Sequence, residues 1–149
     1  MFAARARLLI ATLWVGSLWT VGYLVAPTLF ASLSDRALAG TIAGTMFRIE
    51  AWLSVICAIA MIVLIRSATA GEDRARRKHL LWIATGMLAC TLIGYFGLQP
   101  FMTALREAAG PGGVMDSELK SQFGILHGVS SAFYLGQSVL GVALVLKLR

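Results

Sequence analysis

Four stretches of the chain contain no Asp, Glu, Lys or Arg. They cover residues 8–34, 51–65, 79–105 and 121–146 and contain 27, 15, 27 and 26 residues. A helix needs about 20 mostly apolar residues to cross a bilayer, so three of these stretches are long enough by themselves. The second is long enough only if ionisable neighbours enter the membrane. Because long continuous apolar runs do not alternate as barrel strands do, the pattern predicts an all-α integral membrane four-helix bundle.

The spans are expected at about residues 8–29, 46–66, 79–99 and 126–146, within one domain that covers residues 1–149. Ser32, Ser34 or Asp35 can cap a long second helix, at about residues 35–67, whose first third lies at the outer interface. Gly40 and Gly44 form a G-x-x-x-G on this helix, and an ordinary flexible loop is the alternative there.

Span three meets Pro100, which should bend the helix or end it one residue earlier. A short interfacial helix at residues 101–109 is expected next, until the glycines and proline at residues 110–113 break it. Asp116 or Ser117 is expected to cap the fourth helix, with Glu118 in its first turn. No internal repeat is evident beyond a layout of two hairpins.

Composition agrees with the membrane assignment. The 149 residues are 58% hydrophobic and 13% charged, which lies well outside the range of soluble domains.

The first apolar run greatly exceeds the 7–15 residues or so of a signal-peptide core, so we expect it to be retained as a span.

The net charge of +6 results from basic residues that gather on alternate sides of the spans. Arg5 and Arg7 precede span one, five basic residues lie between spans two and three, and Lys147 and Arg149 follow span four. Because Lys and Arg accumulate on the cytoplasmic side, both termini and the loop at residues 66–78 are expected inside, an N-in/C-in topology. This distribution argues against a nucleic-acid partner, although the basic loop can also contact anionic lipid headgroups.

Polar residues also gather near the outer end of each span. Counting back about 20 residues from Arg66 places Arg48 and Glu50 at or just inside the outer boundary. A polar-to-small stripe on the fourth span, expected to face protein, consists of His127, Ser130, Ser131, Tyr134, Ser138 and Gly141. The candidate polar site comprises Tyr23, Arg48, Glu50, Gln99, His127, Ser130, Ser131 and Tyr134. Two interpretations stay open: helix-to-helix packing, and an outward-facing pocket for a small polar or ionic ligand.

Three segments carry a resemblance to a known family: LWVGSLWTVGYLVAPTLFASLSDRALAGTIAG (13–44), LIGYFGLQPFM (92–102) and FGILHGVSSAFYL (123–135). The chain resembles the bacterial branch of the domain-of-unknown-function 4149 family, which is related to eukaryotic transmembrane protein 205. The resemblance implies a bacterial inner-membrane protein and supplies no catalytic residue. The positions it would carry over are Pro27, Arg48, Gln99, Pro100, His127, Ser130 and Ser131.

The function favoured by these observations is a non-enzymatic structural or accessory component of a membrane complex. We expect the protein to lie in the lipid bilayer and to associate with a second copy of itself or with a larger membrane complex. The alternative is a small transporter or binder of a polar or soft-metal ligand.

Few residues suit a metal, a cofactor or catalysis. His127 is the only histidine in the outer half, too few for a haem or a His-rich copper site, so no cofactor is expected. Cys57 and Cys90 are candidate soft-metal ligands, but buried cysteine more commonly packs as a small apolar residue. Ser130 and Ser131 lie within helical reach of His127, yet that helix offers no orienting carboxylate.

Overall fold

The computed structural model describes residues 2–67, 73–110 and 113–148, and these residues form helices without a β-strand. The elements in order are α1 (Phe2–Trp19), η1 (Thr20–Val25), α2 (Ala26–Ser32), α3 (Arg36–Arg66), α4 (Arg74–Thr91), η2 (Leu92–Gly97), α5 (Gln99–Ala109), η3 (Val114–Asp116) and α6 (Lys120–Lys147). Four continuous helical segments are long and apolar enough to cross a membrane: Ala3–Ser32, Arg36–Arg66, Arg74–Ala109 and Lys120–Lys147. The chain is therefore a multi-pass membrane protein.

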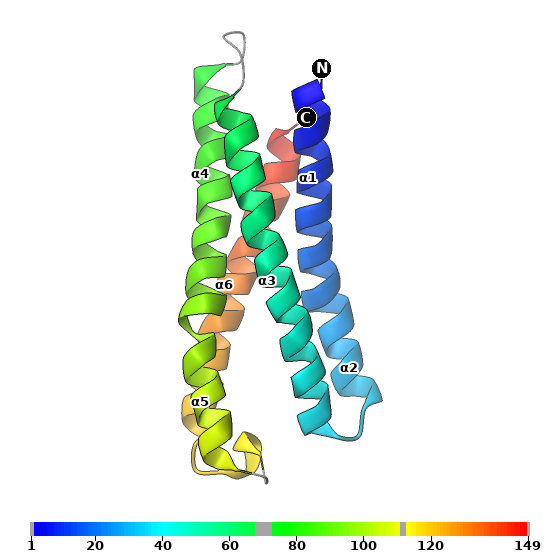
Figure 1. Ribbon diagram of the computed structural model, residues 1–149, viewed down its shortest axis with the longest axis vertical. Coiled ribbons are helices and arrows are strands. Elements are labelled where there is room, and N and C mark those ends of the chain that lie inside the picture. The colour runs from blue at the N-terminus through cyan, green and yellow to red at the C-terminus, as the bar shows by residue number, and fades with distance from the viewer. Residues whose placement is uncertain (1, 68–72, 111–112, 149) are drawn as a thin grey trace.

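The four long segments form an antiparallel ring (Figure 1). α1 packs against α3 and α6, and α4 also packs against α3 and α6. The start of α1, the end of α3, the start of α4 and the end of α6 lie together at one end of the bundle, called the termini end below. The opposite end, called the distal end, contains α2, α5 and the starts of α3 and α6 (Figure 1).

The long second helix has the local features that its sequence predicts. Asp35 is its N-cap, and the carboxylate Oδ1 accepts hydrogen bonds from the N–H groups of Ala37 and Leu38 at 2.9 and 3.0 Å. Gly40 and Gly44 both lie inside this 31-residue helix, so the flexible-loop alternative is wrong.

The expected cap of the fourth helix is also wrong. α6 begins at Lys120, and Leu119 occupies the N-cap position without a side-chain hydrogen bond. Ser117 Oγ instead donates to the Val114 carbonyl and accepts from the Leu119 N–H, and Glu118 lies before the helix. The serine stabilises the 3₁₀ turn η3 rather than the first turn of α6. The sequence predicted a break in the helix at residues 110–113. Gly110 and Gly113 have positive φ angles of 71° and 81°, and residues 111–112 lie outside the described residues.

Two π-helical segments interrupt the spans, and neither was expected. η1 lies between α1 and α2, and η2 lies between α4 and α5. Pro27 and Pro100 follow them within the first two positions of α2 and α5. Because proline has no N–H, the carbonyls four residues earlier, of Tyr23 in η1 and Phe96 in η2, have no α-helical donor there. Pro100 does not end the third helical segment, which continues to Ala109.

α6 inserts polar side chains at both π segments. The Tyr134 hydroxyl donates to the Leu18 carbonyl at 2.5 Å, immediately before η1. The Ser130 hydroxyl donates to the Gly94 carbonyl inside η2 at 2.7 Å. The two hydroxyls of α6 thus bind backbone carbonyls within or close to the two π segments.

Glycine is required at both contacts. A Cβ at Gly22 would overlap the Tyr134 ring, with 2.9 Å to its Cζ atom, and a Cβ at Gly94 would lie 2.7 Å from Phe133 Cβ. Side chains at either site would push α6 away from the bundle.

The π segments also reveal an internal repeat that the sequence pattern did not predict. Gly-Tyr occupies the same two positions of η1 and η2, as Gly22-Tyr23 and Gly94-Tyr95. In the return helices, Gly40-x-x-x-Gly44 and Ser54-Val55-Ile56 match Gly124-x-x-x-Gly128 and Ser138-Val139-Leu140 with the same spacing. The bundle is thus built from two parallel helical hairpins, an arrangement known in membrane proteins with internal repeats.

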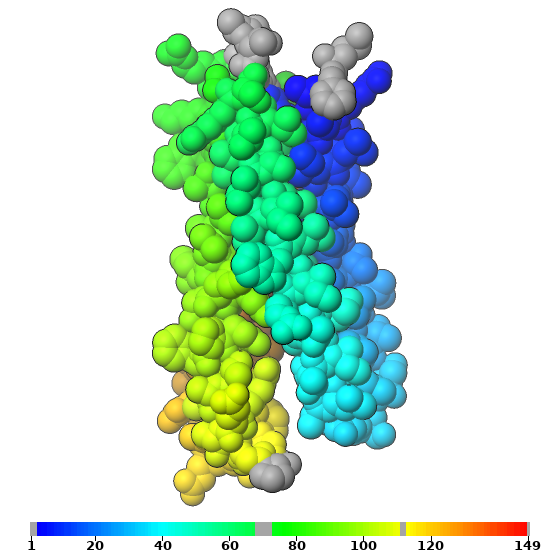
Figure 2. All heavy atoms as spheres, in the orientation of Figure 1, coloured from blue at the N-terminus to red at the C-terminus, as the bar shows by residue number. Residues whose placement is uncertain are grey.

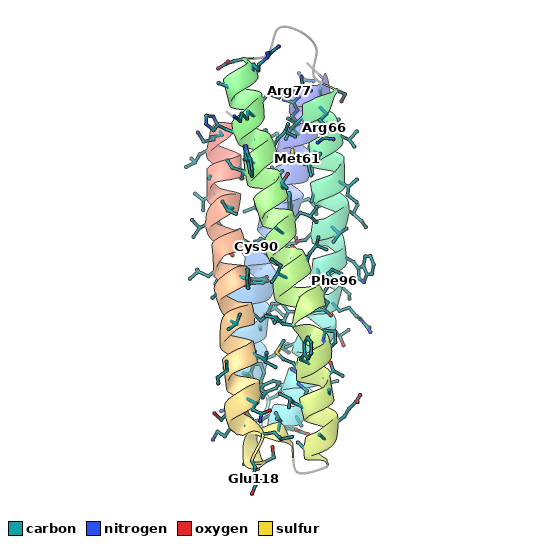
Figure 3. The ribbon with its side chains drawn as sticks, turned by 90° about the vertical axis from the view of Figure 1, so that its left-hand side faces the viewer. Met61, Arg66, Arg77, Cys90, Phe96 and Glu118 are labelled. Carbon is teal, nitrogen blue, oxygen red and sulfur yellow. The ribbon has the colours of Figure 1, made fainter. Side chains whose placement is uncertain are left out.

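The apolar core lies toward the termini end, where arginines bind the carbonyls at helix C-termini. Its fully buried members include Trp14, Met61, Ile65 and Met87. Three arginine side chains bridge helices there: Arg7 Nη2 donates to the Leu64 carbonyl, Arg77 Nη2 to the Arg66 carbonyl, and Arg76 to the Lys147 carbonyl. Figure 3 shows Arg66 and Arg77 at this end and Glu118 at the other. Part of the basic loop therefore has a structural role beyond a topology signal, although residues 68–72 of it lie outside the described part of the chain.

We expect Gly22→Ala to destabilise the protein by about 1–3 kcal/mol, because the added methyl overlaps the Tyr134 ring at a close helix contact. Gly16→Ala is the matched control on the same helical segment, since a Cβ there meets nothing within 4 Å. Thermal unfolding in mild detergent measures the difference. Equal unfolding temperatures for the two variants would contradict the assigned contact.

Candidate functional site

A buried polar network centres on Ser54 in α3. The Trp14 Nε1–H donates to Ser54 Oγ at 2.8 Å, and the Gln137 amide donates to the same oxygen at 3.1 Å. Ser54 Oγ in turn donates to Glu50 Oε1 at 2.7 Å. A hydroxyl has one donor and two acceptor positions, so Ser54 is fully satisfied by residues from α1, α3 and α6.

The sequence positions the network through helical spacing. Glu50 and Ser54 are four residues apart and therefore lie on the same face of α3. Small residues at Ala51 and Ala58 accompany them as buried residues on this helix. Glu50 is only 4% exposed, and an ionisable side chain at such a position is costly unless it has hydrogen-bond partners. Ser54 supplies one of them.

A second polar cluster joins α6 to the first span, beside η1. The Tyr23 hydroxyl donates to Ser138 Oγ at 2.9 Å, and Ser138 Oγ donates to the Tyr134 carbonyl at 2.9 Å. The Tyr134 ring makes edge-to-face contacts with Tyr23 and Phe47, at centroid distances of 6.2 and 5.3 Å. These contacts hold three helices together around one phenol ring.

The predicted candidate residues separate into different environments. Tyr23, Glu50, Ser130 and Tyr134 bind within the bundle, as described above. Arg48 and Gln99 line a groove at the distal end. The stripe on α6 does not face protein along its whole length, because His127 and Ser131 are exposed on the surface of this chain.

The contacts of His127 lie within its own helix. Its ring stacks on Phe123 of the same helix at 6.0 Å between centroids, and Ser131 Oγ donates to the His127 carbonyl rather than to the imidazole. The expectation that His127 lies near Arg48 and Glu50 at one common site gains no support from these contacts.

The groove at the distal end lies between α3 and the η2–α5 segment. Its volume is about 360 Å³, and it is visible in Figure 2 as the hollow between the start of α3 and α5. The lining residues are Gly40, Thr41, Gly44, Thr45, Arg48, Tyr95, Gln99, Thr103 and Arg106. α5 packs on α6, so the two hairpins separate on this side.

Both cysteines are free thiols. Cys57 is buried in the apolar core. Cys90 is half-buried at the end of α4, near the middle of the Arg74–Ala109 segment (Figure 3), and its Sγ lies near Gly136 of α6. Within residues 2–67, 73–110 and 113–148, no group of three or more His, Cys, Asp and Glu side chains could hold a metal ion.

Sequence reasoning missed Trp14, Ser54 and Gln137 as members of the buried network. For two of them the sequence held a signal. Ser54 and Gln137 are polar residues deep inside charge-free stretches, where polar side chains rarely face lipid. Gln137 lies three residues after Tyr134 and four before Gly141, so helical spacing also places it beside the stripe of α6.

The fold and composition define a four-span helical membrane protein. A comparison with protein-family profiles matches residues 9–111 to the family described as "Domain of unknown function (DUF4149)", which is more than half of the chain. The protein belongs to this family. No curated protein and no solved structure matches the chain.

We expect Ser54→Ala to reduce stability by about 1–3 kcal/mol, because Trp14, Gln137 and Glu50 all lose their shared buried partner. Ser67→Ala is the control, since that exposed hydroxyl bonds only to its own helix, and its effect should stay within about 0.5 kcal/mol. Reversible unfolding in mixed detergent micelles provides both values. Ser54→Ala as stable as Ser67→Ala would show that the network does not hold the helices together.

Proposed function

We propose that the protein is a non-enzymatic structural or accessory component of a membrane complex in the bacterial inner membrane. The observation that carries the proposal is an exposed face in the first half of α6. It contains His127, Ser131 and the glycine pair Gly124 and Gly128, and a Cβ at either glycine would meet nothing within 4 Å in this chain.

Such a face is poorly suited to lipid. Ser131 can donate to its own helix, but the His127 imidazole turned toward hydrocarbon would lose the water that its ring nitrogens bind. Paired glycines separated by three residues are typical of close helix contacts in membranes, because they let two backbones approach. A helix from another copy or another membrane protein would satisfy both features.

The non-enzymatic part of the proposal rests on how the hydroxyl groups are used. Ser130 donates to the Gly94 carbonyl, Ser131 to the His127 carbonyl, and Ser138 to the Tyr134 carbonyl. A serine nucleophile would need a base as its partner, and these hydroxyls bind backbone carbonyls instead.

The proposed topology places the termini end in the cytoplasm. Arg7, Arg66, Arg74, Arg76 and Arg77 all belong to the helix ends gathered there, and basic residues near span ends favour the inner side. The distal end with its groove then faces outward.

We expect Gly128→Leu to release the protein from its assembly while the chain itself stays folded, because a Cβ there meets nothing within 4 Å in this chain and a bulky side chain blocks an approaching helix. Gly16→Leu, an equally open position on α1, should leave the assembly intact. Cross-linking in native membranes followed by size analysis compares the two variants at equal abundance. A wild-type protein that is monomeric in the membrane would refute the proposal.

For topology, we expect Ser34→Cys to react with a membrane-impermeant maleimide in intact cells and Ala75→Cys to react only after lysis. Both positions are exposed, and neither substitution changes the charge that sets orientation. The wild-type chain, with Cys57 and Cys90 inside the spans, supplies the background. Labelling of Ala75→Cys in intact cells would reverse the orientation.

A further inference from the structure

We propose that the distal groove between α3 and the η2–α5 segment binds a phosphate group. The groove has two walls from different hairpins: α3 contributes Gly40, Thr41, Gly44, Thr45 and Arg48, and the facing wall contributes Tyr95, Gln99, Thr103 and Arg106. This site goes beyond the structural function proposed above, which concerns a different face of the molecule.

The charge of the lining is positive and uncompensated. Arg48 and Arg106 both line the groove, and the lining residues that the structure describes include no acidic side chain. Glu107 lies in an adjoining hollow that shares Tyr95, Gln99 and Thr103 with the groove, but it does not line the groove itself. Two guanidinium groups in one concave site attract an anion.

The two arginines are available in different ways. Arg48 is exposed and makes no hydrogen bond or ion pair within the described part of the chain, so its five N–H donors remain open. Arg106 lies over the Phe123 ring with 5.0 Å between Cζ and the ring centroid. A guanidinium stacked on an aromatic face keeps its N–H groups at its edge, where they can bind an anion.

The remaining polar groups fit a phosphate better than a simple halide. The Gln99 amide and the Tyr95 hydroxyl add neutral donors on one wall. Thr41 and Thr45 donate to carbonyls of their own helix, which leaves their oxygens as acceptors for a protonated phosphate oxygen or an alcohol of the ligand. Arginine forks match phosphate oxygens in pairs, and two arginines suit the two negative charges of a phosphomonoester.

The phosphate can come from a soluble ion or from a lipid headgroup, and two probes separate these sources. Purified full-length protein in a phosphate-free sugar detergent is titrated with inorganic phosphate against chloride at constant ionic strength, with thermal unfolding as the readout. In the second arm, native mass spectrometry measures binding of phosphatidic acid against diacylglycerol, which has the same acyl chains without the phosphate.

The variants are Arg48→Gln and Arg106→Gln, with Arg36→Gln as the matched control. Arg36 lies at the start of α3, is exposed, and does not line the groove. We expect each groove variant to weaken phosphate binding by about tenfold or more, because charge-assisted hydrogen bonds are lost, and the control to change it by less than about twofold. Arg48→Gln decides the question if Arg106→Gln lowers the unfolding temperature without ligand, since Arg106 also packs on Phe123.

Binding of inorganic phosphate that is lost in the groove variants supports the proposal with a soluble ligand. Binding of phosphatidic acid alone, with the same loss, supports it with a lipid headgroup as the source. If neither inorganic phosphate nor phosphatidic acid binds, the proposal is wrong. Equal binding of diacylglycerol, or equal effects of Arg48→Gln and Arg36→Gln, overturns it as well.

Discussion

Inside a membrane, every backbone polar group must find its partner within the protein, and this constraint governs how α6 sits in the bundle. The two π segments change the spacing of hydrogen bonds in the first and third spans, and α6 supplies a hydroxyl at each, from Tyr134 to Leu18 and from Ser130 to Gly94. Gly22 and Gly94 are small because α6 must come close enough to do so. The polar stripe on α6 is therefore partly explained by the backbone of its neighbours rather than by a ligand.

The sequence predicted those features that depend on neighbouring residues alone. The apolar lengths gave four spans, and Asp35 marked the start of α3 because its carboxylate can reach N–H groups two and three residues ahead. The π segments, the Ser54 network and the arginine contacts at helix ends depend on which helix faces meet, and periodicity does not carry that information. The predicted start of α6 was wrong for a local reason. A serine such as Ser117 can cap a helix or stabilise a 3₁₀ turn, and Ser117 stabilises the turn.

The two hairpins share motifs but use them differently. Tyr23 and Tyr95 occupy the same position of η1 and η2. Tyr23 binds Ser138 and closes the contact between the first span and α6. Tyr95 lines the groove and stacks edge-to-face on Phe96 at 5.2 Å. Among the described residues, the Tyr95 hydroxyl makes no equivalent hydrogen bond to α3, the return helix of the other hairpin. The groove lies between Tyr95 and α3. Ser54, the counterpart of Ser138, is held by Trp14 instead.

The arginine contacts have a mechanical consequence. Arg7, Arg76 and Arg77 fasten the helices to one another at the termini end, while the hairpins diverge at the distal end (Figures 1 and 2). When helices are held at one end, a small rotation there displaces the other end, and the displacement grows in proportion to the distance along the helices. Tyr23 and Tyr134 also join the first span to α6 beside η1, so any rotation of the hairpins about these contacts would displace most the distal ends that line the groove.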